Sequence, residues 1–127
     1  MSLATGVDLV DIQRLQGVID RYGERFLQRI FTERELQEVG KNTASLAARF
    51  AAKEAVAKAL RSGIGVVNWR EIEVLRGEQR EPRLVLHGSA QRIAHELNLT
   101  EWSLTLSHTF SLAIAMVVAI GKEGAIA

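Results

Sequence analysis

Apolar residues recur at helical spacing near the start of the chain. From Asp11 onward they follow one another at steps of three and four residues, which places side chains on one face of an α-helix. This face comprises Ile12, Leu15, Ile19, Tyr22, Phe26 and Ile30. Gly23 interrupts the stretch and predicts two shorter helices in place of one. Thr32 and Glu35 have the spacing of a capping box, which predicts a further short helix over Glu33–Val39.

Two more helices are expected farther along the chain. A run rich in alanine and leucine predicts the longest one, Leu46–Ser62. We expect Ser45 to be its N-cap and Gly63 to end it. A last helix is predicted with Ser89 as its cap, and it extends to about Asn98.

The second half of the chain alternates apolar and polar positions and predicts β-strands. Near the N-terminus, the apolar segment Thr5–Val10 is also predicted as a strand end, with the acidic Asp8 inside it. In the second half, a turn near Gly77 separates two strands, and Pro82 begins the later one, where a missing N–H does least harm. Thr109–Ser111 connect the last two strands. The four strands expected in this half are Glu71–Leu75, Arg83–His87, Trp102–Ser107 and Leu112–Ile120.

This order of elements predicts an α+β fold. Helices come first, strands dominate the second half, and the expected sheet is small and antiparallel. No repeat, low-complexity run or linker divides the sequence, so we expect one domain over residues 1–127. Residues from Gly121 onward are expected to form a loose tail.

The composition restricts the class of protein. Hydrophobic residues make up 47% of the chain and charged residues 24%, which is ordinary for a globular protein in water. No apolar run reaches about 18 residues, so no transmembrane helix is predicted. Sixteen basic and fifteen acidic residues give a net charge of +1. This balance predicts no overall attraction to nucleic acid or to a membrane, so a charged partner would have to bind a local patch.

The N-terminus and the lack of cysteine bear on the compartment. Residues 1–10 lack the charged-then-apolar layout of a secretory signal, and Asp8 and Asp11 argue against a transit peptide. The absence of cysteine excludes disulfides, thiolate metal sites and thiol nucleophiles. We therefore expect a cytoplasmic protein.

The predicted long helix carries the densest polar cluster in the chain. Glu54 and Lys58 are four residues apart and share a helix face, and Arg49 and Lys53 have the same spacing on an adjoining face. On pattern alone, the favoured interpretation is solvated ion pairs that contribute about a few tenths of a kcal/mol. The small alanines between these charges would also allow a ligand or another backbone to approach closely.

Asp8 and His108 each allow two interpretations. Asp8 lies among apolar neighbours, where an unpaired acid would be costly to bury. It can cap the helix that follows, or it can share a hard cation such as Mg²⁺ with Glu54 if the two meet in space. His108 lies where a strand meets a turn, a position that often presents reactive side chains. From local context alone, a structural histidine is somewhat favoured.

Four arginines form a stripe in the first helical stretch. Arg14, Arg21, Arg25 and Arg29 are spaced by seven, four and four residues and fall within about 80° on a helical projection. The apolar face described above lies elsewhere on the projection. The stripe is either an ordinary solvated basic face or a docking surface for an acidic helical partner.

Three segments of the chain stand out together: Gly6-Val7-Asp8-Leu9-Val10, then Arg49 through Ala59 in the predicted long helix, and Ser103 through Thr109 followed by Ala113-Ile114-Ala115. Taken in order, these segments resemble the motifs of the holo-acyl-carrier-protein synthase family of 4′-phosphopantetheinyl transferases. The resemblance covers nearly the whole chain, and the three motifs in this order and spacing are highly specific. The turn of residues 62–65 is a looser match to the family's glycine-rich loop.

The resemblance implies a fold and an activity. It implies the α+β fold of 4′-phosphopantetheinyl transferases, a homotrimer with active sites between neighbouring subunits, and Asp8 and Glu54 as Mg²⁺ ligands. A carrier-protein serine would attack the β-phosphate of coenzyme A and release adenosine 3′,5′-bisphosphate. The product would be a holo-acyl carrier protein for fatty acid biosynthesis. The arginine stripe would receive the acidic recognition helix of the apo-acyl carrier protein.

The resemblance also assigns roles to individual residues. Lys58 would neutralise phosphate oxygens in the transition state, and His108, Arg49 and Lys53 are candidates for the phosphates of the nucleotide. The general base stays open among a metal-bound water, Asp8 and His108. The alternatives from other classes are a non-catalytic module that binds an acidic helix and a structural trimer-forming domain. The presence of Asp8, Glu54, Lys58 and His108 together argues against both.

Overall fold

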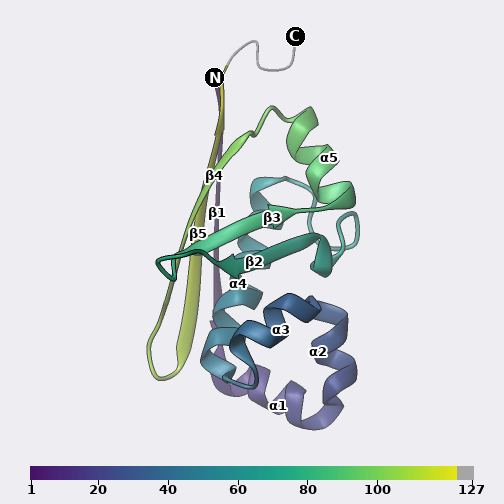
Figure 1. Cartoon of the computed structure of the whole chain (residues 1–127), viewed down its shortest axis with the longest axis vertical. Helices are drawn as coiled ribbons and strands as arrows, with labels where there is room; N and C mark the ends of the chain where they lie inside the picture. The colour runs from purple at the N-terminus through teal and green to yellow at the C-terminus, as the bar shows by residue number, and fades with distance from the viewer. Residues whose placement is uncertain (123–127) are drawn as a thin grey trace.

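A three-stranded antiparallel sheet runs the length of the molecule (Figure 1). The computed structural model describes residues 1–122. The strand order is β1-β5-β4, so the last strand of the chain lies in the centre. The strands are β1 (Ser2–Asp11), β4 (Glu101–His108) and β5 (Leu112–Gly121). The predicted α+β class with a small antiparallel sheet is confirmed.

The N-terminal strand is longer than the sequence predicted. The expected segment was Thr5–Val10, but β1 pairs with β5 over its whole length, from Ser2 opposite Gly121 to Asp11 opposite Leu112. The expectation of helices first was therefore incomplete, because the chain begins with an edge strand of the main sheet. The tail expected from Gly121 is also corrected, since Gly121 is the last residue of β5. Residues 123–127 of that expected tail lie outside the described residues.

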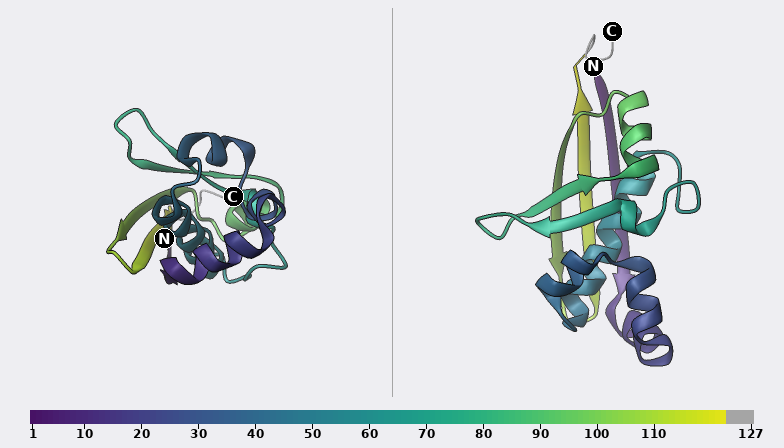
Figure 2. Two further views of the ribbon diagram at one scale, coloured as in Figure 1. Left: turned by 90° about the horizontal axis from the view of Figure 1, so that it is seen from below. Right: turned by 45° about the vertical axis from the view of Figure 1, so that its right-hand side comes forward.

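Four helices follow β1 and gather on one side of the sheet (Figures 1 and 2). The predicted break at Gly23 is confirmed, with a φ of 59° that glycine adopts without steric cost. The predicted capping box is confirmed as well, because Thr32 accepts from the Glu35 backbone N–H while the Glu35 side chain accepts from that of Thr32. The helices are α1 (Ile12–Tyr22), α2 (Glu24–Ile30), α3 (Glu33–Val39) and α4 (Thr43–Ala59).

Both predicted serine caps are wrong. Helix α4 begins three residues earlier than expected, because the side chain of Asn42 caps it and accepts from the Ser45 backbone N–H at 3.0 Å. Its end also precedes Gly63, since Arg61 already takes a left-handed conformation with a φ of 58°. Helix α5 (Gly88–Glu96) has His87 at its N-cap position without a side-chain capping bond. The Ser89 backbone N–H donates instead to the Glu71 carboxylate.

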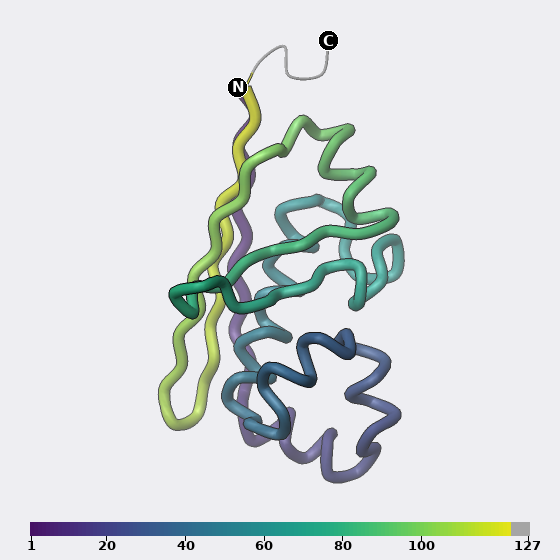
Figure 3. The backbone as a smooth tube through the Cα atoms, viewed as in Figure 1, coloured from purple at the N-terminus to yellow at the C-terminus, as the bar shows by residue number. Residues whose placement is uncertain are grey.

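A two-stranded hairpin crosses in front of α4 and reaches the β4 edge of the sheet (Figures 1 and 3). A short 3₁₀-helix, η1 (Trp69–Glu71), leads into it. The hairpin strands are β2 (Ile72–Arg76) and β3 (Pro82–Leu86), and Pro82 begins the second strand as predicted. No helix within residues 1–122 is both long and apolar enough to cross a lipid bilayer.

The core follows from the composition of α4. Its alanines are almost fully buried and lie against the alternating small residues of β5, so helix and sheet approach closely. A second cluster, formed by α1, α2, α3 and the start of α4, encloses Phe31 and Leu46. Small side chains on α4 and on the sheet thus allow the polar residues of α4 to lie close to the backbone of β1.

Candidate active site

The first candidate centre depends on a close approach between β1 and α4. Gly6 lies directly against α4, and a Cβ atom added to it would stand 1.9 Å from the carbonyl oxygen of Ala55. Real side chains do not tolerate such a distance, so only glycine allows this packing. Asp8 follows Gly6 by two residues, and Glu54 precedes Ala55. The glycine therefore sets the separation between the two acidic residues.

Asp8, Glu54 and Lys58 form one charged cluster at this contact. The Lys58 ammonium donates to Asp8 Oδ1 and to the Val7 carbonyl oxygen, each at 2.9 Å. Burial raises the pKa of the Glu54 carboxyl, the negative charge of Asp8 raises it further, and Lys58 opposes both effects. Asp8 and Glu54 thus lie near enough for their charges to interact, which the sequence alone could not show.

Two local interpretations of these residues are overturned. Asp8 does not cap the following helix, because Asp11 takes that position and accepts from the Arg14 backbone N–H at 3.0 Å. The ion pair that Lys58 forms is with Asp8 on β1, and no ion pair with Glu54 is found among residues 1–122. Sequence spacing favoured the i,i+4 partner, but the tertiary contact supplied a carboxylate from 50 residues away.

The donor set of the cluster fits a magnesium ion that is also bound by substrate. Magnesium is commonly held by one or two carboxylates together with phosphate oxygens and waters. Burial and, after it, the negative charge of Asp8 raise the pKa of Glu54, and a bound cation would oppose both effects. No group of three or more acidic, histidine or cysteine side chains within residues 1–122 forms a complete protein cage for a metal. Asp8 and Glu54 therefore fit a shared ion better than a site closed by protein alone.

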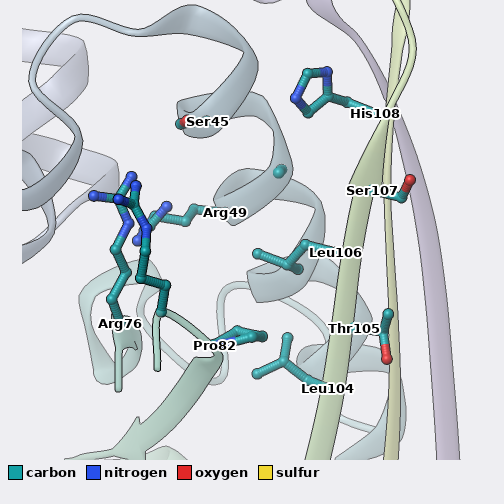
Figure 4. A pocket seen from close by; sticks show the side chains of 11 residues that line it. Ser45, Arg49, Arg76, Pro82, Leu104, Thr105, Leu106, Ser107 and His108 are labelled. Carbon is teal, nitrogen blue, oxygen red and sulfur yellow. The ribbon is translucent and has the colours of Figure 1, made fainter. Parts of the chain in front are cut away.

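A second candidate centre is a cavity of about 430 Å³ between α4, the β2–β3 hairpin and β4 (Figure 4). His108 projects from β4 toward it, and Arg49 projects from α4. Arg76 and Arg80 also line the cavity, although no sequence motif singled them out. They belong to a hairpin about 30 residues from Arg49, so only the fold brings them together. The remaining lining residues are Ser45, Ala48, Pro82, Leu104, Thr105, Leu106 and Ser107.

Lys53 lies apart from both centres. Its side chain is fully buried, and its ammonium donates to Glu35 Oε1 at 2.8 Å and to the carbonyl oxygens of Trp69 and Ile72. Burial lowers the pKa of Lys53, while the adjacent Glu35 opposes that shift. All three ammonium donors are thus engaged inside the fold. This geometry argues against the expected contact of Lys53 with nucleotide phosphates, and it also overturns the solvated interpretation.

The two centres lie on opposite faces of α4. Arg49 precedes Lys58 by nine residues, which at about 100° per residue places them half a turn apart. Asp8 and His108 lie on the outer strands of the sheet, with β5 between them and a register offset of two residues. Standard strand spacings separate their Cα atoms by roughly 12 Å. One chain therefore does not bring His108 and Arg49 into contact with the carboxylates.

The arginine stripe is divided between two helices. All four of its arginines are exposed, but Gly23 separates Arg14 and Arg21 on α1 from Arg25 and Arg29 on α2. The helices run in different directions, so the projection onto a single helix does not hold (Figure 1). Arg14 lines a cavity of about 290 Å³ together with Asp8, Val18 and Phe26. The stripe thus adjoins the carboxylate centre.

The sheet face that points away from α4 is apolar and exposed. Its side chains alternate with the buried ones along β1 and β5, as expected for strands with one face against a core. Several are more than half exposed, which is unusual for a contiguous group of large apolar residues. The group comprises Leu3 at 61%, Val7 at 51%, Leu9 at 60%, Leu112 at 42%, Ile114 at 37% and Met116 at 51% exposure.

Comparison with known sequences identifies a family. Residues 4–115 match the model of the 4′-phosphopantetheinyl transferase superfamily. The chain is 49% identical over 126 residues to a holo-(acyl-carrier-protein) synthase of Herpetosiphon aurantiacus, covering 94% of this chain and 99% of the relative. It is 46% identical over 118 residues to a protein of the same name from Carboxydothermus hydrogenoformans, covering 91% of this chain and 95% of that relative.

Solved structures with the same name share the fold. The Helicobacter pylori enzyme in complex with coenzyme A superposes with a TM-score of 0.84 at 30% identity, covering 91% of this chain and 99% of that one. The Neisseria meningitidis enzyme gives a TM-score of 0.84 at 34% identity, with coverages of 92% and 97%. The similarity thus extends over both candidate centres.

Proposed function

The chain belongs to the 4′-phosphopantetheinyl transferase superfamily, and we propose on that premise that it is a holo-acyl-carrier-protein synthase. It transfers 4′-phosphopantetheine from coenzyme A to a serine of apo-acyl carrier protein and releases adenosine 3′,5′-bisphosphate. The observation that carries the proposal is the cluster of Asp8, Glu54 and Lys58, which Gly6 holds together. The product serves fatty acid biosynthesis in the cytoplasm.

Mass spectrometry tests this activity. The protein is incubated with an apo-acyl carrier protein, coenzyme A and Mg²⁺, and the carrier protein should gain one phosphopantetheine group of about 340 Da. A matched reaction with the Asp8→Asn variant should give no gain. A non-catalytic module for acidic helices would bind the carrier protein without any change of its mass, and that outcome would refute the proposal.

Magnesium dependence is the next element of the proposal. Asp8 and Glu54 would hold the ion, which when bound offsets negative charge on the pyrophosphate of coenzyme A. Calorimetry should show Mg²⁺ binding to the wild type in the presence of coenzyme A, and weaker binding to Asp8→Asn and Glu54→Gln. Both variants should lose most transfer activity while they keep the circular dichroism spectrum of the wild type. Near-normal turnover of both at limiting Mg²⁺ contradicts the assignment.

The other polar residues act on the phosphates. The Lys58 side chain is about half exposed, and its ammonium already lies against Asp8, so a phosphate oxygen can approach the same positive charge. Lys58 would stabilise negative charge that develops as the phosphoanhydride bond breaks. Arg49 and His108 line the second cavity and would bind the nucleotide end of coenzyme A.

We propose a homotrimer with active sites between subunits, and the placement of the two centres supports it. Within one chain, Arg49 and His108 lie across α4 from Asp8 and Glu54, so a neighbouring copy would complete each site. The exposed apolar face of β1 and β5 offers a surface for that association. Light scattering should give the mass of three chains, and a single-chain mass for active protein contradicts the assembly.

Mixing of inactive variants tests the shared site directly. Asp8→Asn and His108→Ala should each be inactive alone, because each damages one half of every site. When equal amounts are unfolded and refolded together, about a quarter of the sites should receive both intact residues and regain activity. A mixture that stays as inactive as its components would refute a site shared between subunits.

The arginine stripe would bind the acidic helix of the carrier protein. Exposed charges attract a partner over about 8 Å at physiological salt, so their loss weakens encounter more than chemistry. Arg14→Glu with Arg21→Glu should strongly raise the KM for the carrier protein and leave the affinity for coenzyme A nearly unchanged. An unchanged carrier-protein KM identifies the stripe as ordinary surface.

A further inference from the structure

Two arginines outside the recognised motifs add positive charge to the cavity of Arg49 and His108. Arg76 ends β2, and Arg80 lies in the turn that joins β2 to β3. The cavity is therefore lined by three guanidinium groups, from two elements that are far apart in sequence (Figure 4). A concentration of like charges in one cavity indicates an anionic ligand rather than an apolar one.

Glu38 on α3 fixes the orientation of two of these arginines. Its Oε1 accepts from Arg49 Nη2 at 3.3 Å and from the Arg76 backbone N–H at 2.9 Å. Arg76 Nη1 donates in turn to the Glu38 carbonyl oxygen at 3.2 Å. Arg49 Nε donates to the Val74 carbonyl oxygen at 3.1 Å, so this buried guanidinium is held from two sides. Both arginines are thus oriented before any ligand arrives.

The charges of the cavity do not balance. Burial lowers the pKa of Arg49, the positive charge of Arg76 lowers it further, and Glu38 and Glu35 oppose the shift. Glu35 is already engaged by Lys53 on the interior side of α4. Three guanidinium groups line the cavity, and none of the described residues that line it is acidic. Glu38 lies beside the cavity and pairs with Arg49. The lining therefore carries a surplus of positive charge that an anionic ligand would neutralise.

Arg80 occupies a backbone conformation that favours glycine. Its φ is 64°, and its side chain forms no hydrogen bond or ion pair with any of residues 1–122. This conformation alone assigns no role, because Arg61 has a φ of 58° and does not line the cavity. The location distinguishes the two residues: Arg80 presents an unengaged guanidinium where two others already converge.

We propose that Arg76 and Arg80 complete, with Arg49, a three-guanidinium site for the phosphomonoester of the nucleotide substrate, and that Glu38 is the positioning residue of this site. The inference rests on the proposed function and assigns the site to the 3′-phosphate of coenzyme A. A phosphomonoester carries nearly two negative charges at neutral pH, which suits the positively charged lining of the cavity. Guanidinium groups also match phosphate oxygens in geometry, which favours them over lysine for this task.

Calorimetry with coenzyme A and 3′-dephospho-coenzyme A tests the site. The Arg80→Gly variant should fold, because glycine adopts the turn conformation without steric cost. It should bind coenzyme A about tenfold more weakly than the wild type and bind the dephospho form equally well. The matched control is Arg61→Gly, which removes the same charge from the same backbone conformation outside the cavity and should change neither affinity.

Two outcomes separate this inference from the proposed function. If the wild type binds coenzyme A and Arg80→Gly binds it equally tightly, the three-guanidinium site is wrong while the proposed function stands. If the wild type binds no coenzyme A at all, the proposed function fails and the site fails with it. Equal affinity of the wild type for both forms of coenzyme A would also overturn the assignment to the 3′-phosphate.

Glu38→Ala tests the positioning role by the sign of its effect. Removal of a negative charge beside the cavity should by itself tighten the binding of adenosine 3′,5′-bisphosphate. Loss of the side-chain contact that orients Arg49 should weaken that binding instead. We expect about fivefold weaker binding, with recovery in Glu38→Gln, which keeps an acceptor oxygen. Tighter or unchanged binding by Glu38→Ala refutes the positioning role.

Discussion

The contact between Gly6 and Ala55 permits a quantitative prediction. In Gly6→Ala, the added Cβ would stand 1.9 Å from the Ala55 carbonyl oxygen, whereas ordinary contacts of this kind begin near 3.4 Å. The difference of about 1.5 Å must be taken up by β1 moving away from α4, since the obstacle is backbone. Overpacking of this kind should reduce the free energy of unfolding by about 1–3 kcal/mol.

The same displacement should impair the reaction more than the fold. Asp8 lies two residues from Gly6, and Glu54 adjoins Ala55, so the carboxylates would separate by about the same distance. A misplacement of about 1 Å can reduce a rate by about a hundredfold, and we expect a loss of that order in the transfer rate. If Asp8 and Glu54 hold Mg²⁺ as proposed, part of the loss should be recovered at high Mg²⁺, because their separation would weaken metal binding.

Transfer rates at several Mg²⁺ concentrations, together with chemical denaturation, measure both effects. Gly17→Ala is the matched control for stability, because a Cβ at that exposed helical glycine meets no atom within 4 Å. It should raise the free energy of unfolding by about 0.5–1 kcal/mol. Wild-type stability and wild-type transfer by Gly6→Ala would refute the argument that this glycine sets the carboxylate separation.

Three further predictions concern ionisable groups. Burial and the charge of Asp8 raise the pKa of Glu54, so the ionised carboxylate destabilises the metal-free fold at neutral pH. Glu54→Gln should therefore raise the melting temperature of the metal-free protein. A lower melting temperature would contradict this destabilising role of Glu54. Lys53→Met leaves Glu35 buried without its cation and should cost about 3–5 kcal/mol in urea denaturation, whereas a cost below about 1 kcal/mol would show that the pair is dispensable. Burial raises the pKa of Glu73, but hydrogen bonds from Thr32 and His87, together with the charges of Arg34 and His87, outweigh it and hold the pKa below the ordinary value of 4.5. The stability that Glu73 contributes is therefore present above about pH 4.5 and is lost as the pH falls through the folded-state pKa. Glu73→Gln should reduce the loss of unfolding free energy between neutral and acidic pH. An unchanged loss over that range would contradict this role of Glu73.

The sequence predicted most elements because their signals were local. The capping box of α3, the break at Gly23 and the position of Pro82 each depend on residues within a few positions of one another. The serine caps were wrong for a related reason. Ser45 has the chemistry of a cap, but Asn42 offered an equally good acceptor three residues earlier, and spacing alone did not decide between them.

The candidate site was less predictable because its contacts are long-range. Sequence resemblance named Asp8, Glu54 and Lys58, but the ion pair of Lys58 with Asp8 joins residues 50 positions apart. Lys53 looked like a surface residue, and only the packing of α3 and β2 against α4 reveals its buried partners. Arg76 and Arg80 carried no signal at all, since hairpin arginines are common on protein surfaces.

The two functional faces of α4 have a consequence for mixtures of intact and defective chains. In the proposed assembly, helix α4 of each chain contributes the face with Glu54 to one active site and the opposite face, with Arg49, to the neighbouring active site. A substitution that tilts the whole helix would then disable two sites in every trimer that contains it, although only one chain is altered. When such a variant is produced alongside the normal chain, the fraction of activity lost should exceed the fraction of chains that carry the substitution. Substitutions confined to one face should lack this dominance.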